Sequence, residues 1–314
     1  MTTRFTIRPR APFRLDLTVW ALRRRAHNAI DRYSGGVYRR ALIFDGEALA
    51  VSVRQTGPPR TPLLEVAAQR PAHLCCDRAS EQCIARFARE ALERMLGPHI
   101  DLGGFMHATR KDPVLSPLAI AMRGLKPPRF PTVFEALANG IACQQLSLDV
   151  GIHLLNRLAS SFGPAPAGAA AELHAFPGPV ELAEAKSASL RRLGFSAAKA
   201  RALVGAAGAV AAGALDLEGL ASERREIAME RLTDLEGVGR WTAEYVLLRG
   251  LGRIDTFPVD DAGARNKLAR VLRVEHRLDA ASTASIVARW RPYAGIAYFH
   301  LLLDSLSQAG LVEG

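Results

Sequence analysis

Hydrophobic and polar residues follow two different patterns along the chain, one before and one after about residue 130. In the first third, short runs alternate apolar and polar residues, or are largely apolar, as is typical of strands. These runs cover residues 13–19, 37–44, 48–53 and 63–68. Asp45-Gly46, between the second and third runs, is a dipeptide typical of a tight hairpin turn. Residues 84–95 then carry apolar side chains on one helical face.

From Thr132 onward, apolar residues recur every three or four positions almost to the end of the chain. This period predicts helices over residues 132–143, 150–162, 181–193, 196–212, 223–235, 240–250, 261–271 and 279–290, and a last one after Pro292. Residues 164–180 are expected to form a loop, and Asp112-Pro113 with residues 126–131 a linker. The predicted fold class is α+β, with a small N-terminal domain of antiparallel sheet and helix at 1–112 and a helical region at 113–314.

Length and composition limit the class of protein. A chain of 314 residues with 49% hydrophobic content can bury a sizeable core. No apolar run approaches the roughly 18 residues of a membrane span, and the N-terminus lacks a signal-peptide core, so we expect a soluble, cytoplasmic protein without a membrane partner. The four cysteines form no C-x-x-C pair, which argues against a metal or cluster site and predicts no cofactor.

The net charge of +10 and the pI near 10.0 favour a polyanionic partner. Arginine outnumbers lysine 36 to five, and a GC-rich genome would produce the same bias without any function. Such a genome does not, however, require basic residues to outnumber acidic ones, so the composition favours nucleic-acid binding.

The most informative stretch is LEGVGRWTA at residues 235–243, which joins two predicted helices through a Gly-x-Gly turn. Gly237 and Gly239 permit positive φ angles and the close approach of another chain. The following helix presents unpaired amides and a positive dipole end, which suit a phosphate. The alternative is an ordinary turn between helices, but the flanking apolar residues favour a packed hairpin.

This stretch resembles the hairpin of the helix-hairpin-helix (HhH-GPD) DNA glycosylases, and from about Asp112 onward the chain is most similar to the bacterial DNA-3-methyladenine glycosylase II family. The resemblance implies two helical lobes and a monomer that binds duplex DNA with damaged bases. It also implies excision of flipped-out, alkylated, cationic purines in base excision repair. In the hairpin, DNA would contact Gly237, Val238, Gly239, Arg240 and Thr242. Alternatives are a non-catalytic DNA-binding protein and a glycosylase for oxidised or deaminated bases.

In that family an essential aspartate follows the hairpin after one helix and a loop. Asp261, twenty residues beyond Trp241, has the implied spacing, and Asp260 is the alternative. A carboxylate beside the sugar would stabilise the positive charge of the oxocarbenium-like transition state and activate the attacking water. An aspartate before a helix is also a favoured N-cap, and the pair can divide both roles.

Three aromatic residues are candidates for the base pocket by the same resemblance. Trp241 and Tyr245 share a helix face, and Tyr293 follows Pro292 at the start of another helix. An N-alkylated purine carries positive charge, and an aromatic face attracts a cation. The alternative for Trp241 and Tyr245 is a place in the hydrophobic core.

Bifunctional family members carry a lysine two residues after the second hairpin glycine, which attacks the sugar. Trp241 stands there in this chain, so the resemblance implies a monofunctional enzyme. The absence of cysteines after Cys143 disfavours the branch with an iron–sulfur cluster.

Residues 141–147 resemble the family's turn from which a side chain fills the gap left by the flipped base. Gln144, Gln145 and Leu146 would contact DNA there, with Gln145 or Leu146 as the wedge. The alternative is a polar cap at the end of a helix.

Overall fold

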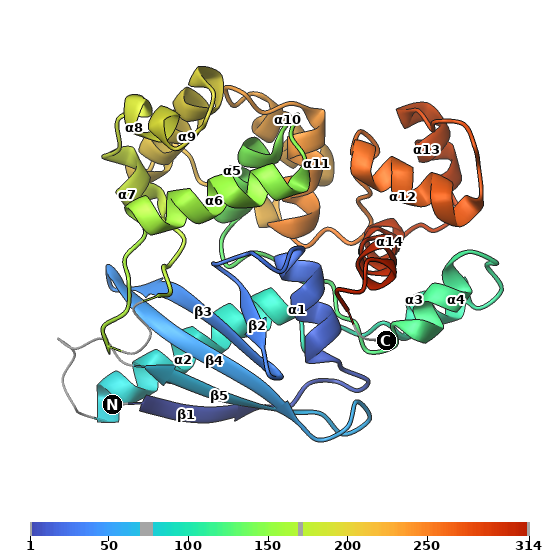
Figure 1. Cartoon of the computed structure of the whole chain (residues 1–314), viewed down its shortest axis with the longest axis horizontal. Coiled ribbons are helices and arrows are strands. Elements are labelled where there is room, and N and C mark those ends of the chain that lie inside the picture. The colour runs from blue at the N-terminus through green and yellow to red at the C-terminus, as the bar shows by residue number, and fades with distance from the viewer. Residues whose placement is uncertain (1, 70–77, 169–171, 313–314) are drawn as a thin grey trace.

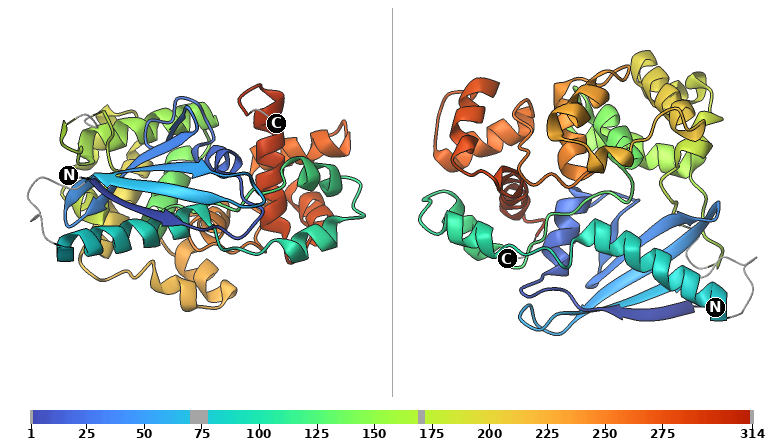
Figure 2. Two further views of the ribbon diagram at one scale, coloured as in Figure 1. Left: turned by 90° about the horizontal axis from the view of Figure 1, so that it is seen from below. Right: turned by 180° about the vertical axis from the view of Figure 1, so that it is seen from behind.

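The computed structural model describes residues 2–69, 78–168 and 172–312, and it confirms the α+β fold class (Figure 1). Five antiparallel strands form one sheet in the order β1-β5-β4-β3-β2. Their bounds are β1 Thr2–Ile7, β2 Arg32–Ser34, β3 Val37–Phe44, β4 Glu47–Thr56 and β5 Leu63–Gln69. Helix α2, Arg78–Leu96, runs along one face of the sheet, as the right view of Figure 2 shows.

The hairpin between β3 and β4 forms where the sequence predicts it. Asp45 and Gly46 both have positive φ, 51° and 76°, which is the conformation of a two-residue type I′ turn. The turn sets the register, in which Phe44 pairs with Glu47 and Val37 with Arg54.

The prediction of a strand at residues 13–19 is wrong. Residues Leu15–Arg23 form helix α1 instead. Leu15, Val19 and Leu22 enter one apolar core, whereas Leu17 and Ala21 enter a second. Because a helix buried on both sides needs apolar residues on both faces, its sequence imitates the alternation of a strand.

Most of the predicted helices are confirmed within a few residues. They are α5 Val133–Cys143, α6 Leu148–Phe162, α9 Ala197–Ala211, α10 Arg225–Thr233, α11 Arg240–Arg249, α12 Ala262–Leu272, α13 Ala280–Ala288 and α14 Ala294–Gln308. Hydroxyl or carboxylate side chains cap the N-termini of α5, α6, α9, α12 and α13. Such N-cap residues make the start of a helix predictable from the sequence. The helix predicted around residues 84–95 is also confirmed, as α2, whereas the short helical elements were predicted less well.

The predicted helix at 181–193 is two helices, α7 Pro179–Ala183 and α8 Ser187–Arg192, because Lys186 between them is extended. Two helices before α5 were not predicted: α3, Gly103–Thr109, and α4, Leu115–Ala121. Each contains residues that indicate a turn, the glycine pair that opens α3 and Pro117 in the first turn of α4. A 3-10 turn, Gly219–Ser222, precedes α10.

The segment predicted as a linker, residues 126–131, is extended but mostly buried. The carbonyl oxygen of Phe130 accepts a hydrogen bond from the side chain of Arg94 (Nε, 3.1 Å), and its amide donates to Arg249 O (2.8 Å). The two apolar cores both draw residues from either side of position 112, so the domain division there stays a prediction. Within the described residues, no helix is both long and apolar enough to cross a membrane.

A buried ionic cluster joins the sheet to α5. Arg40 on β3, 1% exposed, donates from Nη1 to Asp31 Oδ1 (2.6 Å) and from Nη2 to Glu135 Oε1 on α5 (2.6 Å). Tyr38 donates its hydroxyl to the same Asp31 oxygen at 2.6 Å. Burial opposes the charge of Arg40, but the two carboxylates outweigh it and raise the pKa of Arg40 well above its ordinary value.

We predict that Arg40→Met lowers the free energy of unfolding by about 3–5 kcal/mol, because it leaves two buried carboxylates without their cation. The measurement is urea unfolding followed by circular dichroism. Arg39→Met is the matched control: Arg39 is the exposed neighbour on β3, and its change should stay within about 0.5 kcal/mol. Equal effects of the two substitutions would contradict a special role for the cluster.

Candidate active site and DNA-binding face

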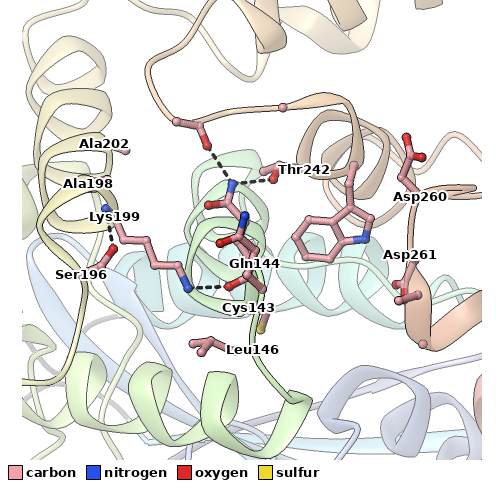
Figure 3. A pocket seen from close by; sticks show the side chains of 16 residues that line it. Cys143, Gln144, Leu146, Ser196, Ala198, Lys199, Ala202, Thr242, Asp260 and Asp261 are labelled. Carbon is pink, nitrogen blue, oxygen red and sulfur yellow. Dashed lines mark hydrogen bonds between the residues drawn. The ribbon is translucent and has the colours of Figure 1, made fainter.

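A cavity of about 860 Å³ brings together most of the residues selected from the sequence (Figure 3). Four segments surround it: the turn between α5 and α6, the first turns of α9, the hairpin between α10 and α11, and the loop that enters α12. The predicted site residues that line it are Gln144, Gln145, Leu146, Gly237, Gly239, Trp241, Thr242, Asp260 and Asp261. In Figure 3 the two aspartates face Ser196, Lys199 and Ala202 of α9 across this space.

The two hairpin glycines serve different purposes. Gly237 has a φ of 75°, and an added Cβ would lie 2.8 Å from Cβ of Ala202 on α9. Gly239 has a φ of −90°, so the expected positive φ is wrong at this position. A Cβ on Gly239 would meet no protein atom within 4 Å. Gly239 therefore keeps the N-terminus of α11 accessible from outside, whereas Gly237 lets the hairpin pack on α9.

Four of the predicted DNA contacts are engaged or buried within the protein. Gln144 donates from Nε2 to Gly237 O (2.7 Å) and to Thr242 Oγ1 (2.8 Å), and Thr242 is 1% exposed. Val238 is also buried, and Arg240 pairs with acidic side chains nearby. These contacts tie the α5–α6 turn to the hairpin.

Lysine 199, which the sequence did not single out, holds the same turn from α9. Its Nζ donates to the carbonyl oxygens of Ala142 (3.0 Å) and Gln144 (2.7 Å). Burial lowers the pKa of Lys199. Gln145, with a φ of 53°, and Leu146, 42% exposed, stand outward from the fixed turn. The turn is thus rigidly held and presents these two side chains.

The two aspartates have different partners. Asp261 is the N-cap of α12, where Oδ1 accepts from Ala264 N at 2.9 Å, and Oδ2 lies 3.3 Å from the hydroxyl of Tyr298 on α14. Asp260 Oδ2 lies 3.6 Å from Arg240 Nε. The predicted N-cap is therefore present on Asp261.

Tyr298 is a site residue that sequence reasoning missed. Burial and the adjacent carboxylate of Asp261 raise the pKa of Tyr298 well above its ordinary value, so its hydroxyl stays protonated and donates to Asp261. The sequence places Tyr298 within a strongly apolar helix, which gives no signal for a polar role.

The three predicted pocket aromatics are not equivalent. Trp241 lines the cavity, and its ring centroid is 5.7 Å from that of Tyr245. Tyr245 is 2% exposed and accepts from Arg24 Nη1 at 2.8 Å, so it lies behind Trp241. Tyr293 is not among the lining residues of this cavity, so its role in the base pocket stays a prediction.

Tyr293 precedes α14 and packs on α3 instead. Its ring centroid is 6.0 Å from that of Phe105, and its hydroxyl occupies the space beside Gly104. The next tyrosine along α14, Tyr298, is the one that reaches Asp261.

Comparison with known proteins agrees with this arrangement. Residues 139–292, which include the α5–α6 turn, the hairpin and both aspartates, match the HhH-GPD superfamily of base excision DNA repair proteins. This match spans just under half of the chain, which is therefore similar to the superfamily over its central and C-terminal helices.

Several of the similar proteins are named DNA-3-methyladenine glycosylases. A DNA-3-methyladenine glycosylase 2 of Escherichia coli is 29% identical over 220 residues, 70% of this chain and 71% of the relative. A putative DNA-3-methyladenine glycosylase of Bacillus subtilis is 30% identical over 170 residues, 54% of this chain and 58% of that protein. A second B. subtilis glycosylase of this name is matched over 66% of its length. A solved 3-methyladenine DNA-glycosylase from Archaeoglobus fulgidus superposes with a TM-score of 0.82 at 25% identity, over 96% of this chain and 98% of that one.

The hairpin geometry predicts opposite effects for alanine at its two glycines. Gly239→Ala should leave stability unchanged and weaken binding of duplex DNA, because the added methyl group projects only toward the ligand. Gly237→Ala should cost about 1–3 kcal/mol of stability through its positive φ and its contact with Ala202. Urea unfolding and fluorescence anisotropy with a labelled duplex measure the two quantities. A destabilised Gly239→Ala with normal binding would refute this geometry.

Proposed function

We propose that the protein is a monofunctional DNA N-glycosylase that removes alkylated, positively charged purines from duplex DNA. The proposal rests on one cavity that is lined by the α10–α11 hairpin, the exposed α5–α6 turn, Trp241 and Asp261. The names of the relatives support the same activity. We further propose that a monomer is active, and that it works in the cytoplasm.

Binding would begin at the hairpin. The first amides of α11 have no partner within the helix and lie beside the bare Gly239, so a DNA phosphate can approach them. Gln145 or Leu146, held outward on the turn, would fill the gap in the duplex when the damaged nucleotide rotates out.

The flipped base would stack on Trp241. A 3-alkylated or 7-alkylated purine carries a positive charge, and the face of an indole ring attracts such a cation. The cationic base is already a good leaving group and needs little help from a general acid. A neutral, undamaged purine lacks both advantages, and this difference would provide selectivity.

Asp261 would stabilise the reaction at the sugar. As the bond between C1′ and the base nitrogen breaks, its electron pair leaves with the base, and positive charge develops on the deoxyribose. The carboxylate of Asp261 stabilises that charge, and a water that attacks C1′ gives up its proton to the carboxylate. The contacts from Ala264 and Tyr298 fix the direction of this carboxylate. We therefore assign catalysis to Asp261. Asp260 instead forms an ion pair with Arg240.

The decisive experiment measures release of free bases from alkylated duplex DNA, with the products identified by chromatography. Asp261→Asn should slow release at least about a hundredfold, because an amide cannot balance the charge of the sugar, and should leave DNA affinity unchanged. Asp260→Asn is the matched control and should retain most activity. Inactivity of Asp260→Asn alone would move the catalytic role by one residue. DNA binding without release by the wild-type protein would favour a non-catalytic binder, and release of oxidised bases alone would favour that class of lesion.

We also predict that the product is an intact strand with an abasic site. Trp241 occupies the position at which an amine would attack, and Lys199, which lines the cavity, is held by two carbonyl oxygens. Borohydride should therefore trap no enzyme–DNA adduct, and strand breaks should appear only after alkali or heat. Efficient trapping that Lys199→Met abolishes would overturn the monofunctional assignment.

A further inference from the structure

A buried carboxylate beneath the hairpin has no part in the mechanism described so far. Glu244, on the second turn of α11, is 3% exposed. Its Oε1 accepts from Arg240 Nε at 3.1 Å, and its Oε2 accepts from the backbone amide of Val259 at 3.1 Å. Burial raises the pKa of Glu244, although its hydrogen bonds to Arg240 and Val259 act in the opposite direction. Burying a carboxylate is unfavourable unless it is hydrogen-bonded, and Glu244 has two such partners.

The first partner belongs to the catalytic loop. Val259 stands two residues before Asp261, and the loop closes there through a hydrogen bond from Asp261 N to Pro258 O at 3.1 Å. The Val259 side chain is buried in the core formed with α12 and α14. The hydrogen bond from its amide to Glu244 attaches this loop to α11. Glu244 thus fixes how the loop crosses the edge of the cavity.

The second partner belongs to the DNA-binding hairpin. Arg240 is the first residue of α11, and its side chain is largely exposed. Among the described residues, its only hydrogen-bonded nitrogen is Nε, which also lies 3.6 Å from Asp260. The two terminal nitrogens of the guanidinium remain available for a phosphate. A continuous path therefore runs from the phosphate-facing hairpin through Glu244 to the loop of Asp261.

We propose that Glu244 is a positioning residue that attaches the catalytic loop to the hairpin and thereby couples the seating of DNA to the placement of Asp261. This inference rests on the proposed glycosylase function. It assigns Glu244 no contact with the base or the sugar. Its role is to keep the carboxylate of Asp261 within reach of C1′ when the hairpin holds the strand.

Glutamine and alanine at position 244 separate this role from simple stability. Glu244→Gln keeps a carbonyl oxygen for the Val259 amide, whereas Glu244→Ala removes the acceptor. The readouts are the single-turnover rate of base release from alkylated duplex DNA and the Kd for a duplex with a tetrahydrofuran abasic analogue. Glu230→Ala is the matched control, because Glu230 is an exposed glutamate on the neighbouring helix α10.

We expect Glu244→Ala to slow the single-turnover rate by about ten- to a hundredfold, as a carboxylate displaced by about 1 Å would. The Kd should change less than about threefold, and Glu244→Gln should recover most of the rate, since hydrogen bonding to Val259 is preserved. A rate equal to that of Glu230→Ala would overturn the proposal. So would a loss that appears equally in Kd and rate, or a Gln variant as slow as Ala.

Amide hydrogen exchange of the free protein keeps the test independent of activity. Exchange in the peptide that spans residues 256–264 should accelerate in Glu244→Ala and not in Glu230→Ala, whether or not the protein releases bases. Unchanged exchange in that peptide would overturn the positioning role. If the wild-type protein released no base from alkylated DNA, the proposed function would fail, while the exchange result would still decide the attachment of the loop.

Discussion

The buried cluster of Arg40, Asp31 and Glu135 is the interaction on which the arrangement of the site depends. It fastens α5 to the sheet with charged hydrogen bonds that have no access to water. Such a cluster contributes little net stability compared with apolar packing, but it tolerates only one relative position of its members. The sheet therefore sets the position of α5, the helix that ends at the α5–α6 turn.

Close packing of α5 against α11 then fixes the position of the hairpin. An added Cβ on Gly140 of α5 would lie 2.8 Å from Thr242 on α11, and one on Gly250 would lie 2.9 Å from Ala136. The two helices can approach this closely only because both positions are bare. Gln144 then bonds the end of α5 to the hairpin itself. The α5–α6 turn and the start of α11 are consequently held together as one unit.

The sequence was sufficient for features that depend on neighbours along the chain. The hairpin at Asp45-Gly46, the capped helices and the Gly-x-Gly turn all follow from local patterns, and the family resemblance selected most of the residues around the cavity. It was insufficient where an outcome depended on contacts between distant segments. The apolar residues of α1 imitated a strand because the helix touches two cores. Tyr298 was not singled out, because its contact with Asp261 depends on how α14 packs beside the loop before α12, which no local pattern reveals. The sequence could not separate the two hairpin glycines: only Gly237 has the positive φ, whereas Gly239 leaves open space beside the start of α11.

Helices α1 and α11 each contribute residues to both apolar cores, and Arg249 of α11 donates to the carbonyl oxygens of Ala21 and Leu22 at the end of α1. Trp241 packs against one core, and Tyr298, the partner of Asp261, belongs to the other. Trp241, which would hold the base, and Asp261, which would stabilise the sugar, are therefore tied to two different cores that α1 and α11 both enter. We expect a one-residue insertion in α1, which lines no part of the cavity, to shift the two cores against each other. Substrate choice in such a protein can change through the spacing of its cores while every residue of the site stays the same.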